Sequence, residues 1–291
     1  MSGRAGRRRS FGVVTAAVLS AALLASCAGS ASDAPGAAPP GTGTSTTIEY
    51  APGLTEDLYL PAGQGRVPLV VLVPGGGWAT ADPTGLAGLA SNLAEAGVAA
   101  APTHLRAAQD GVTYPTPLED VLCAVAAAAD RLRSRGFVPD PVAVLGHSSG
   151  AHLAALAVLA VDDYSPTCDL PVVRPAALVG LSGPYDISQV PEVASALLGT
   201  SPDDDPDTWA AANPVDRADL RPDVPVLLLH GEDDETVPVD FTTQFAEALD
   251  EAGHPTTVEV VPGVDHLGIF EPDVAGPPVV AWLRSLGGDA G

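Results

Sequence analysis

A serine between two glycines is the feature of this sequence best suited to covalent chemistry. The run Gly146-His147-Ser148-Ser149-Gly150 follows an apolar segment at 142–145 and precedes residues 151–160, which contain neither proline nor glycine. An apolar strand, a Gly-x-Ser-x-Gly turn and a helix indicate a nucleophile elbow, a tight turn that exposes the serine hydroxyl. The pattern also arises by chance in glycine-rich chains, and the alternative is a plain Gly/Ser turn between a strand and a helix.

A histidine that would activate Ser148 occurs late in the chain. His266 follows an expected strand at 257–261, where a loop at a strand end can bring an imidazole to the serine. Of the six histidines, only His266 combines this position with the order serine, acid, histidine. We expect a structural role for four of the others, which are His104, His147, His152 and His254.

An acid that would orient His266 lies in the segment His-Gly-Glu-Asp-Asp-Glu at 230–235, after an apolar run at 226–229. A carboxylate at a strand end can accept the histidine N–H and fix its tautomer. The spacing before Val237 favours Asp234, with Asp233 and Glu232 as alternatives. An exposed acidic loop would explain the charges but not the strand before them.

Three glycines followed by a tryptophan end the apolar run at 68–73. Glycines let backbone N–H groups face a site without side chains in the way, as an oxyanion hole requires. We expect the N–H groups of Gly76 and Gly77, together with that of Ser149, to hold the oxyanion. A plain flexible turn is the alternative, and Trp78 favours a packed loop.

Strand and helix patterns alternate from residue 47 onward. Strands are expected at 47–50, 58–60, 68–73, 98–102, 142–145, 176–181, 226–229 and 257–261, and helices at 85–96, 118–135, 151–160, 239–252 and 273–286. Such alternation predicts an α/β fold with a mostly parallel, doubly wound sheet of about eight strands and helices on both faces. The segment 182–225 is long for a connection, which predicts either a small lid or substrate wall, or a solvated excursion with one extra helix.

In this order the motifs resemble the α/β-hydrolase superfamily, within the serine esterase branch that includes hormone-sensitive-lipase-like and feruloyl- or acetylxylan-esterase-like enzymes. The resemblance covers about 67–286. Similar enzymes have histidine before the three glycines, where this chain has Pro74, and often Tyr-Arg-Leu where it has Thr103-His104-Leu105. The first difference bears on the oxyanion loop.

The motifs and the resemblance together predict a serine carboxylic-ester hydrolase acting on short-chain or carbohydrate-linked esters. The composition of residues 1–26, which is typical of an export signal, predicts that this hydrolase is extracytoplasmic. Ser148 would form an acyl-enzyme with His266 as general base and Asp234 as its partner, without a metal ion or organic cofactor. Two alternatives remain: an amidase or peptidase on the same fold, or a catalytically inactive ligand-binding lipoprotein.

The charge of the chain is strongly asymmetric. All 13 basic residues are arginines, four of them before position 10, whereas all 36 acidic residues lie beyond position 32. An acidic body repels the phosphate backbone, so nucleic acid is not an expected partner. The sequence leaves open the natural substrate, its acyl chain length and the oligomeric state.

The first 26 residues have the composition of an export signal, with early arginines and an apolar stretch at 11–25. Leu24-Ala25-Ser26-Cys27 resembles the lipobox of bacterial lipoproteins, which implies that Cys27 is acylated and anchors the protein to the outer face of a membrane. A cleaved signal and a secreted protein are the alternative. Residues 27–46 would form the lipidated start and a flexible linker to a domain at 47–291.

Two cysteines remain in the expected domain. Export would place Cys123 and Cys168 in an oxidising compartment, where paired cysteines form disulfides. We therefore expect a disulfide between them.

Overall fold

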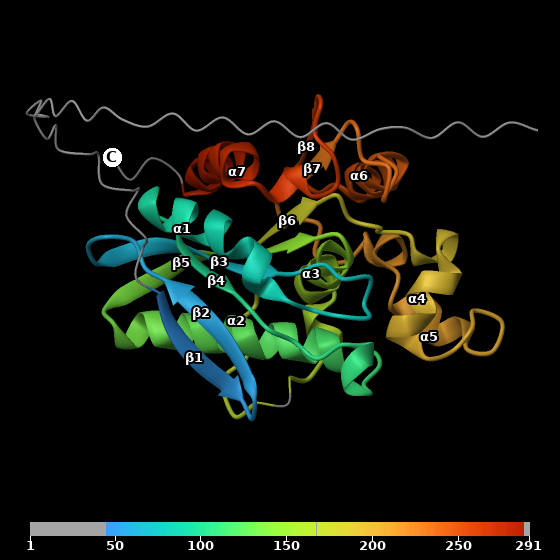
Figure 1. Cartoon of the computed structure of the whole chain (residues 1–291), viewed down its shortest axis with the longest axis horizontal. Coiled ribbons are helices and arrows are strands. Elements are labelled where there is room, and N and C mark those ends of the chain that lie inside the picture. Colours follow the sequence, from blue (N-terminus) through green and yellow to red (C-terminus); the bar gives the residue numbers. More distant parts are fainter. Residues whose placement is uncertain (1–44, 167, 288–291) are drawn as a thin grey trace, which may run out of the picture. The chain divides into compact units, whose positions relative to one another are not determined.

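A twisted sheet of eight strands forms the centre of the structure, a computed structural model that describes residues 45–166 and 168–287 (Figure 1). The strand order is β1-β2-β4-β3-β5-β6-β7-β8. The six strands β3 to β8 run parallel to one another, whereas β1 and β2 add an antiparallel edge. The bounds are β1 Ser45–Ala51, β2 Leu54–Tyr59, β3 Gly65–Val73, β4 Ala99–Pro102, β5 Phe137–His147, β6 Ala177–Leu181, β7 Val226–Gly231 and β8 Thr256–Val261.

Helices cover both faces of this sheet. Helices α1 (Ala87–Glu95) and α7 (Pro272–Leu286) pack on one face, and α2 (Thr116–Ser134), α3 (Ser149–Leu159) and α6 (Asp240–Ala252) pack on the other. Strand β3 shows why its sequence is continuously apolar, since Leu69 and Val71 face the α2/α3 side while Val70 and Leu72 face the α1/α7 side. This is the doubly wound α/β-hydrolase fold that the sequence predicts.

The structure differs from the expected elements in three places. Strand β5 begins at Phe137 rather than at 142, because residues 137–139 pair with the start of β3. The expected helix at 85–96 divides into a 3₁₀ turn, Pro83–Leu86, and α1. The segment 182–225, hereafter the insertion, holds two α-helices rather than one, α4 (Pro191–Leu198) and α5 (Pro206–Ala211).

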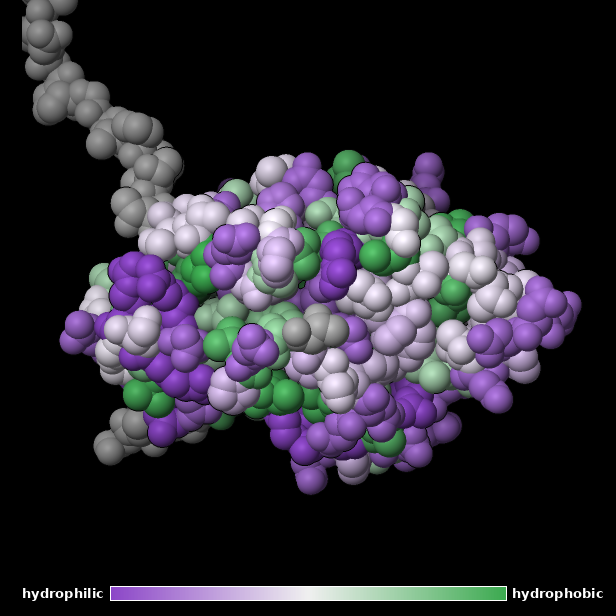
Figure 2. Space-filling view, turned by 90° about the horizontal axis from the view of Figure 1, so that it is seen from below, coloured by the Kyte–Doolittle hydropathy of each residue, from purple (hydrophilic) through white to green (hydrophobic). Residues whose placement is uncertain are grey.

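Figure 2 shows one face of the described part. On the face shown in Figure 2, hydrophobic residues form only scattered patches among hydrophilic ones. Within 45–166 and 168–287, no helix has both the length and the apolar character needed to cross a bilayer. The expected signal peptide, the lipidation site Cys27 and nearly all of the expected linker lie outside the described residues.

A disulfide joins Cys123 of α2 to Cys168, in the connection that leads to β6, as the sequence predicts. The two cysteines are 45 residues apart, so the bond closes a long loop in the unfolded chain. Changing both to alanine is expected to lower the free energy of unfolding by about 2–4 kcal/mol. Chemical denaturation with and without dithiothreitol measures this; the reductant should destabilise the wild-type protein and leave the double variant unchanged, and equal stability of the two proteins would contradict the prediction.

Glu56 of β2 carries a buried carboxyl group. Its residue is 1% exposed, and neither carboxyl oxygen has a hydrogen-bond partner among the described residues. Burial raises the pKa of Glu56 well above its usual value, so the folded protein keeps it protonated at pH values where the unfolded chain ionises it.

This burial makes stability depend on pH. Between the unfolded and folded pKa of Glu56, the folded state binds one more proton, so the wild-type protein loses about 1.4 kcal/mol of stability per pH unit as the pH rises. The Glu56→Gln variant lacks this loss. Thermal melts from pH 5 to pH 9 are expected to show its advantage growing with pH; a difference in melting temperature that stays constant would contradict the protonation of Glu56.

Candidate active site

Ser148 occupies a strained turn between β5 and α3. Its φ of 53° and ψ of −127° are unusual for a residue with a side chain, and its N–H donates to the carbonyl of Leu181 at 2.9 Å. The flanking glycines are required sterically. A Cβ at Gly146 would lie 2.1 Å from the carbonyl oxygen of Gly150, and a Cβ at Gly150 would lie 2.3 Å from that of Val73. The turn is therefore a nucleophile elbow at the carboxyl edge of the sheet.

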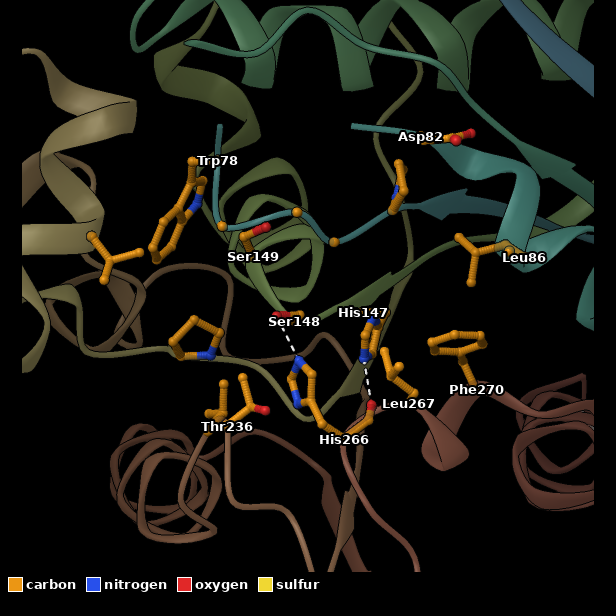
Figure 3. A pocket seen from close by; sticks show the side chains of 18 of the residues that line it. Trp78, Asp82, Leu86, His147, Ser148, Ser149, Thr236, His266, Leu267 and Phe270 are labelled. Carbon is orange, nitrogen blue, oxygen red and sulfur yellow. Dashed lines mark hydrogen bonds between the residues drawn. The ribbon is translucent and has the colours of Figure 1, made fainter. Parts of the chain in front are cut away.

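A chain of hydrogen bonds connects Ser148 to an acid through an imidazole. His266 Nε2 lies 2.9 Å from Ser148 Oγ, and His266 Nδ1 lies 2.7 Å from Asp234 Oδ2 (Figure 3 shows the first of these bonds). The other carboxylate oxygen of Asp234 accepts the backbone N–H groups of Thr236 and Val237 at 2.9 and 2.8 Å. The structure thus brings together the three residues expected from the sequence.

Asp234, and neither Glu232 nor Asp233, is the acid in this chain of hydrogen bonds. Its side chain is fully buried, whereas Glu232 and Asp233 are exposed. Burial raises the pKa of Asp234, but the hydrogen bonds from Val237 and His266 outweigh it, and the net pKa lies below the usual value. The ionised carboxylate accepts Nδ1–H of His266, which leaves Nε2 free to accept the proton of the Ser148 hydroxyl.

His230 supports the turn that carries Asp234. The ring is fully buried at the end of β7, where Nε2–H donates to the carbonyl of Val237 at 2.8 Å and Nδ1 accepts the Thr242 hydroxyl at 2.7 Å. Burial lowers the pKa of His230, in keeping with this neutral arrangement. His230 therefore fixes both ends of the short loop from which Asp234 reaches His266.

His147, the residue before the nucleophile, supports His266. Its Nε2–H donates to the backbone carbonyl of His266 at 2.8 Å, and its ring packs 4.7 Å from both the His266 and Phe270 rings. Burial, with a smaller effect of His266, lowers the pKa of His147 to about 4, so the ring is neutral near pH 7. The structural role expected for His147 is thus the placement of the loop that carries His266.

Residues 75–78, hereafter the glycine loop, lie beside the elbow. Gly76, Gly77 and Trp78 all have positive φ, and a Cβ at Gly76 would lie 2.3 Å from the carbonyl oxygen of Thr80. The Gly76 carbonyl accepts N–H groups from Ala79 and Thr80 at 3.1 and 3.2 Å, which closes the loop as a turn. Gly76 and Gly77 line the same pocket as Ser148 and Ser149. Backbone hydrogen bonds thus close the loop although Pro74, and not a histidine, precedes it.

The pocket above Ser148 encloses about 500 Å³ and has largely apolar walls. Trp78 and Thr236 lie on one side of Ser148, and Leu86, Phe270 and Leu267 lie on the other (Figure 3). The insertion adds apolar side chains to the wall, namely Pro184, Val190 and Val193. The expected substrate wall is therefore formed in part by α4, where Val193 is 51% exposed at the pocket.

Residues 56–249 match the family described as BD-FAE, which is more than half of the chain. The chain belongs to the BD-FAE family. This BD-FAE protein is 29% identical over 228 residues to Esterase LipQ of Mycobacterium tuberculosis, a match that covers 72% of this chain and 53% of LipQ. It is 31% identical over 199 residues to the probable carboxylic ester hydrolase LipM of the same organism, covering 64% and 45%. The chain spans about half the length of these curated relatives.

Solved structures resemble this BD-FAE chain over most of its length. A truncated carbohydrate esterase from gut microbiota matches with a TM-score of 0.72 at 22% identity, covering 83% of this chain and 95% of that one. Apo esterase 2 of Thermogutta terrifontis matches with a TM-score of 0.71 at 23% identity, covering 85% and 97%. These matches show the α/β-hydrolase fold.

Proposed function

We propose that this protein is a serine carboxylic-ester hydrolase with Ser148, His266 and Asp234 as its catalytic triad. The observation that carries the proposal is the continuous hydrogen-bonded chain from the Ser148 hydroxyl through His266 to Asp234. The esterase names of the relatives support the same reaction class.

Each residue has one role in the proposed reaction. Ser148 Oγ attacks the ester carbonyl while His266 Nε2 takes its proton, and Asp234 stabilises the resulting imidazolium. The N–H groups of Gly76, Gly77 and Ser149 hold the oxyanion. His266 then protonates the alcohol oxygen as the bond to the acyl carbon breaks. Water, deprotonated by His266, attacks the acyl-enzyme, and the acid leaves as Ser148 regains its proton.

We propose that the substrates are uncharged esters, either short-chain or linked to a carbohydrate. None of the described residues lining the pocket is an arginine or a lysine, and Asp82 contributes a carboxylate, so an anionic substrate would meet no permanent counter-charge. One structural relative is titled an acetyl ester-xyloside bifunctional hydrolase from Caldicellulosiruptor lactoaceticus. This title motivates including acetylated xylan among the substrates tested.

Acid quenching during turnover tests the reaction class. With p-nitrophenyl acetate and butyrate, mass spectrometry of digested protein is expected to find the acyl group on the peptide that contains Ser148. Parallel assays with acetylated xylan, a feruloyl ester and matched anilides rank the substrates. Faster cleavage of the anilides would favour an amidase, and the absence of both turnover and acyl adduct would favour a ligand-binding protein.

We also propose that the protein is exported and anchored through Cys27, a proposal supported by the sequence of residues 1–27 alone. In a bacterial host that processes lipoproteins, the wild-type protein is expected in the membrane fraction. The Cys27→Ser variant is expected to leave it. Equal membrane association of the two proteins would overturn the anchor.

A further inference from the structure

His152, one turn into α3 after the nucleophile, has a contact on each ring nitrogen. The residue is fully buried. Its Nδ1 lies 3.2 Å from Trp78 Nε1, and its Nε2 lies 2.8 Å from the backbone carbonyl oxygen of Ala212. These contacts join α3 to the glycine loop on one side and to the insertion on the other.

The chemistry of the two partners fixes the state of the His152 ring. An indole N–H only donates and a carbonyl oxygen only accepts, so Nδ1 must accept from Trp78 while Nε2–H donates to Ala212. The ring is therefore neutral with its proton on Nε2. Burial, opposed by the bond to Ala212, lowers the pKa of His152 to about 4, which agrees with a neutral ring near pH 7.

Trp78 ends the glycine loop in a conformation that needs support. Its φ of 58° is left-handed, which is unfavourable for a residue with a large side chain. Trp78 is 4% exposed, and its indole meets the His152 ring edge-on, with ring centroids 5.2 Å apart and an interplanar angle of 86°. The bond to His152 is the hydrogen bond of the indole N–H, so it ties the end of the loop to the helix that begins at the nucleophile.

The insertion end of the contact is also held firmly. Ala212 caps the end of α5, and the next residue, Asn213, is 5% exposed. The Asn213 side chain accepts the Ile187 N–H at 2.9 Å and donates to Asp186 at 3.2 Å. The Ala212 carbonyl that accepts the His152 N–H therefore belongs to a turn of the insertion that side-chain hydrogen bonds of Asn213 hold in place.

We propose that His152 is a positioning residue that sets the glycine loop in register with Ser148 and couples the loop to the insertion. The inference rests on the proposed esterase reaction, in which Gly76 and Gly77 hold the oxyanion. Those donors act only when they lie at hydrogen-bond distance from the oxygen that becomes charged. Loosening the loop should therefore lower kcat more than it raises KM.

The test compares variants on p-nitrophenyl butyrate. His152→Phe keeps a ring and removes both hydrogen bonds, and it is expected to lower kcat about 10- to 100-fold with KM changed less than about 3-fold. His152→Asn, whose side-chain oxygen can replace Nδ1 as acceptor, is expected to recover part of the loss. Trp78→Phe removes the donor, and the double variant with His152→Phe is expected to be no slower than the slower single variant.

His254 provides a matched control. It too is buried, with Nδ1 and Nε2 facing the carbonyl oxygens of Val224 and Ala218 at 2.9 and 2.8 Å, but it does not line the pocket. His254→Phe is expected to lower stability and leave kcat unchanged, which separates positioning from general destabilisation. If His152→Phe does not fold, the kcat of Trp78→Phe relative to that of the wild type tests the positioning role instead, and a lower kcat is expected.

Three results would overturn the positioning role while leaving the esterase reaction intact. The first is a wild-type kcat in His152→Phe or, if that variant does not fold, in Trp78→Phe. The second is a double variant in which the losses of kcat from the two single variants are fully additive. The third is a fall of kcat in His254→Phe equal to that in His152→Phe. Absence of turnover in the wild-type protein would instead overturn the proposed function and the inference with it.

Discussion

Replacing Ser148 by alanine is expected to lower kcat by about 10⁶-fold, because it removes the hydroxyl that lies 2.9 Å from His266 Nε2 and that attacks the ester in the proposed reaction. Substrate binding depends on the pocket walls, so KM is expected to change little. Purified protein and a p-nitrophenyl ester suffice for the measurement, with the background hydrolysis of the ester subtracted.

Ser134→Ala is the control for this change. Ser134 is an exposed serine at the end of α2, where its hydroxyl donates to the carbonyl of Arg131 at 2.7 Å. It is expected to retain wild-type kcat. Turnover by Ser148→Ala within tenfold of the wild type would show that another nucleophile does the work.

Asp234→Asn is expected to lower kcat by about 10⁴-fold. The amide is neutral, so it cannot stabilise the imidazolium that forms on His266. It can also present an N–H toward Nδ1, which would place the histidine proton on Nε2 and block acceptance from Ser148. The loss is expected in kcat, with the fold preserved, because asparagine has the same shape.

The Asp233→Asn variant is a close control. Asp233 is adjacent to Asp234 and its side chain is exposed, so this variant removes the same charge from a neighbouring position. It is expected to keep kcat within about threefold of wild type, because an exposed charge in water contributes little. A larger loss in Asp233→Asn than in Asp234→Asn would mean that the wrong carboxylate has been assigned.

The sequence predicts the elements and the positions of Ser148 and His266 because their signals are local. Ser148 follows the buried apolar end of β5, His266 comes soon after β8, and backbone contacts within the elbow itself require the glycines around Ser148. The sequence does not single out Asp234 as the acid in the same way, since three carboxylates lie side by side at 232–234. The choice among them depends on which one turns inward, and in the structure the N–H groups of Thr236 and Val237 hold Asp234 in that rotamer.

The sequence predicts a structural role for His147 and His152 but not their partners. His147 and His152 bond to backbone carbonyls 119 and 60 residues away. A carbonyl is common to every residue type, so such partners leave no trace in the pattern of side chains. The only sequence signal was the presence of two histidines within and just after the Gly-x-Ser-x-Gly motif, which is compatible with many roles.

The start of β5 and the shape of the insertion depended on tertiary contacts for the same reason. Residues 137–141 include two prolines and an aspartate, a composition unfavourable for a central strand, yet residues 137–139 pair with the start of β3. Within the insertion, the sequence predicts a lid or substrate wall as one of two alternatives, but not that α4 lines the pocket beside the glycine loop. There a Cβ on Gly77 would lie 3.8 Å from Val193.

Labelling with a fluorophosphonate tests the central claim most directly, because this reagent reacts with a serine only when a neighbouring base has activated it. After digestion, mass spectrometry is expected to find the phosphonyl group on the peptide containing Ser148, with labelling lost in Ser148→Ala and strongly slowed in Asp234→Asn. An unlabelled wild-type protein, or a label carried by a different serine, would contradict the account.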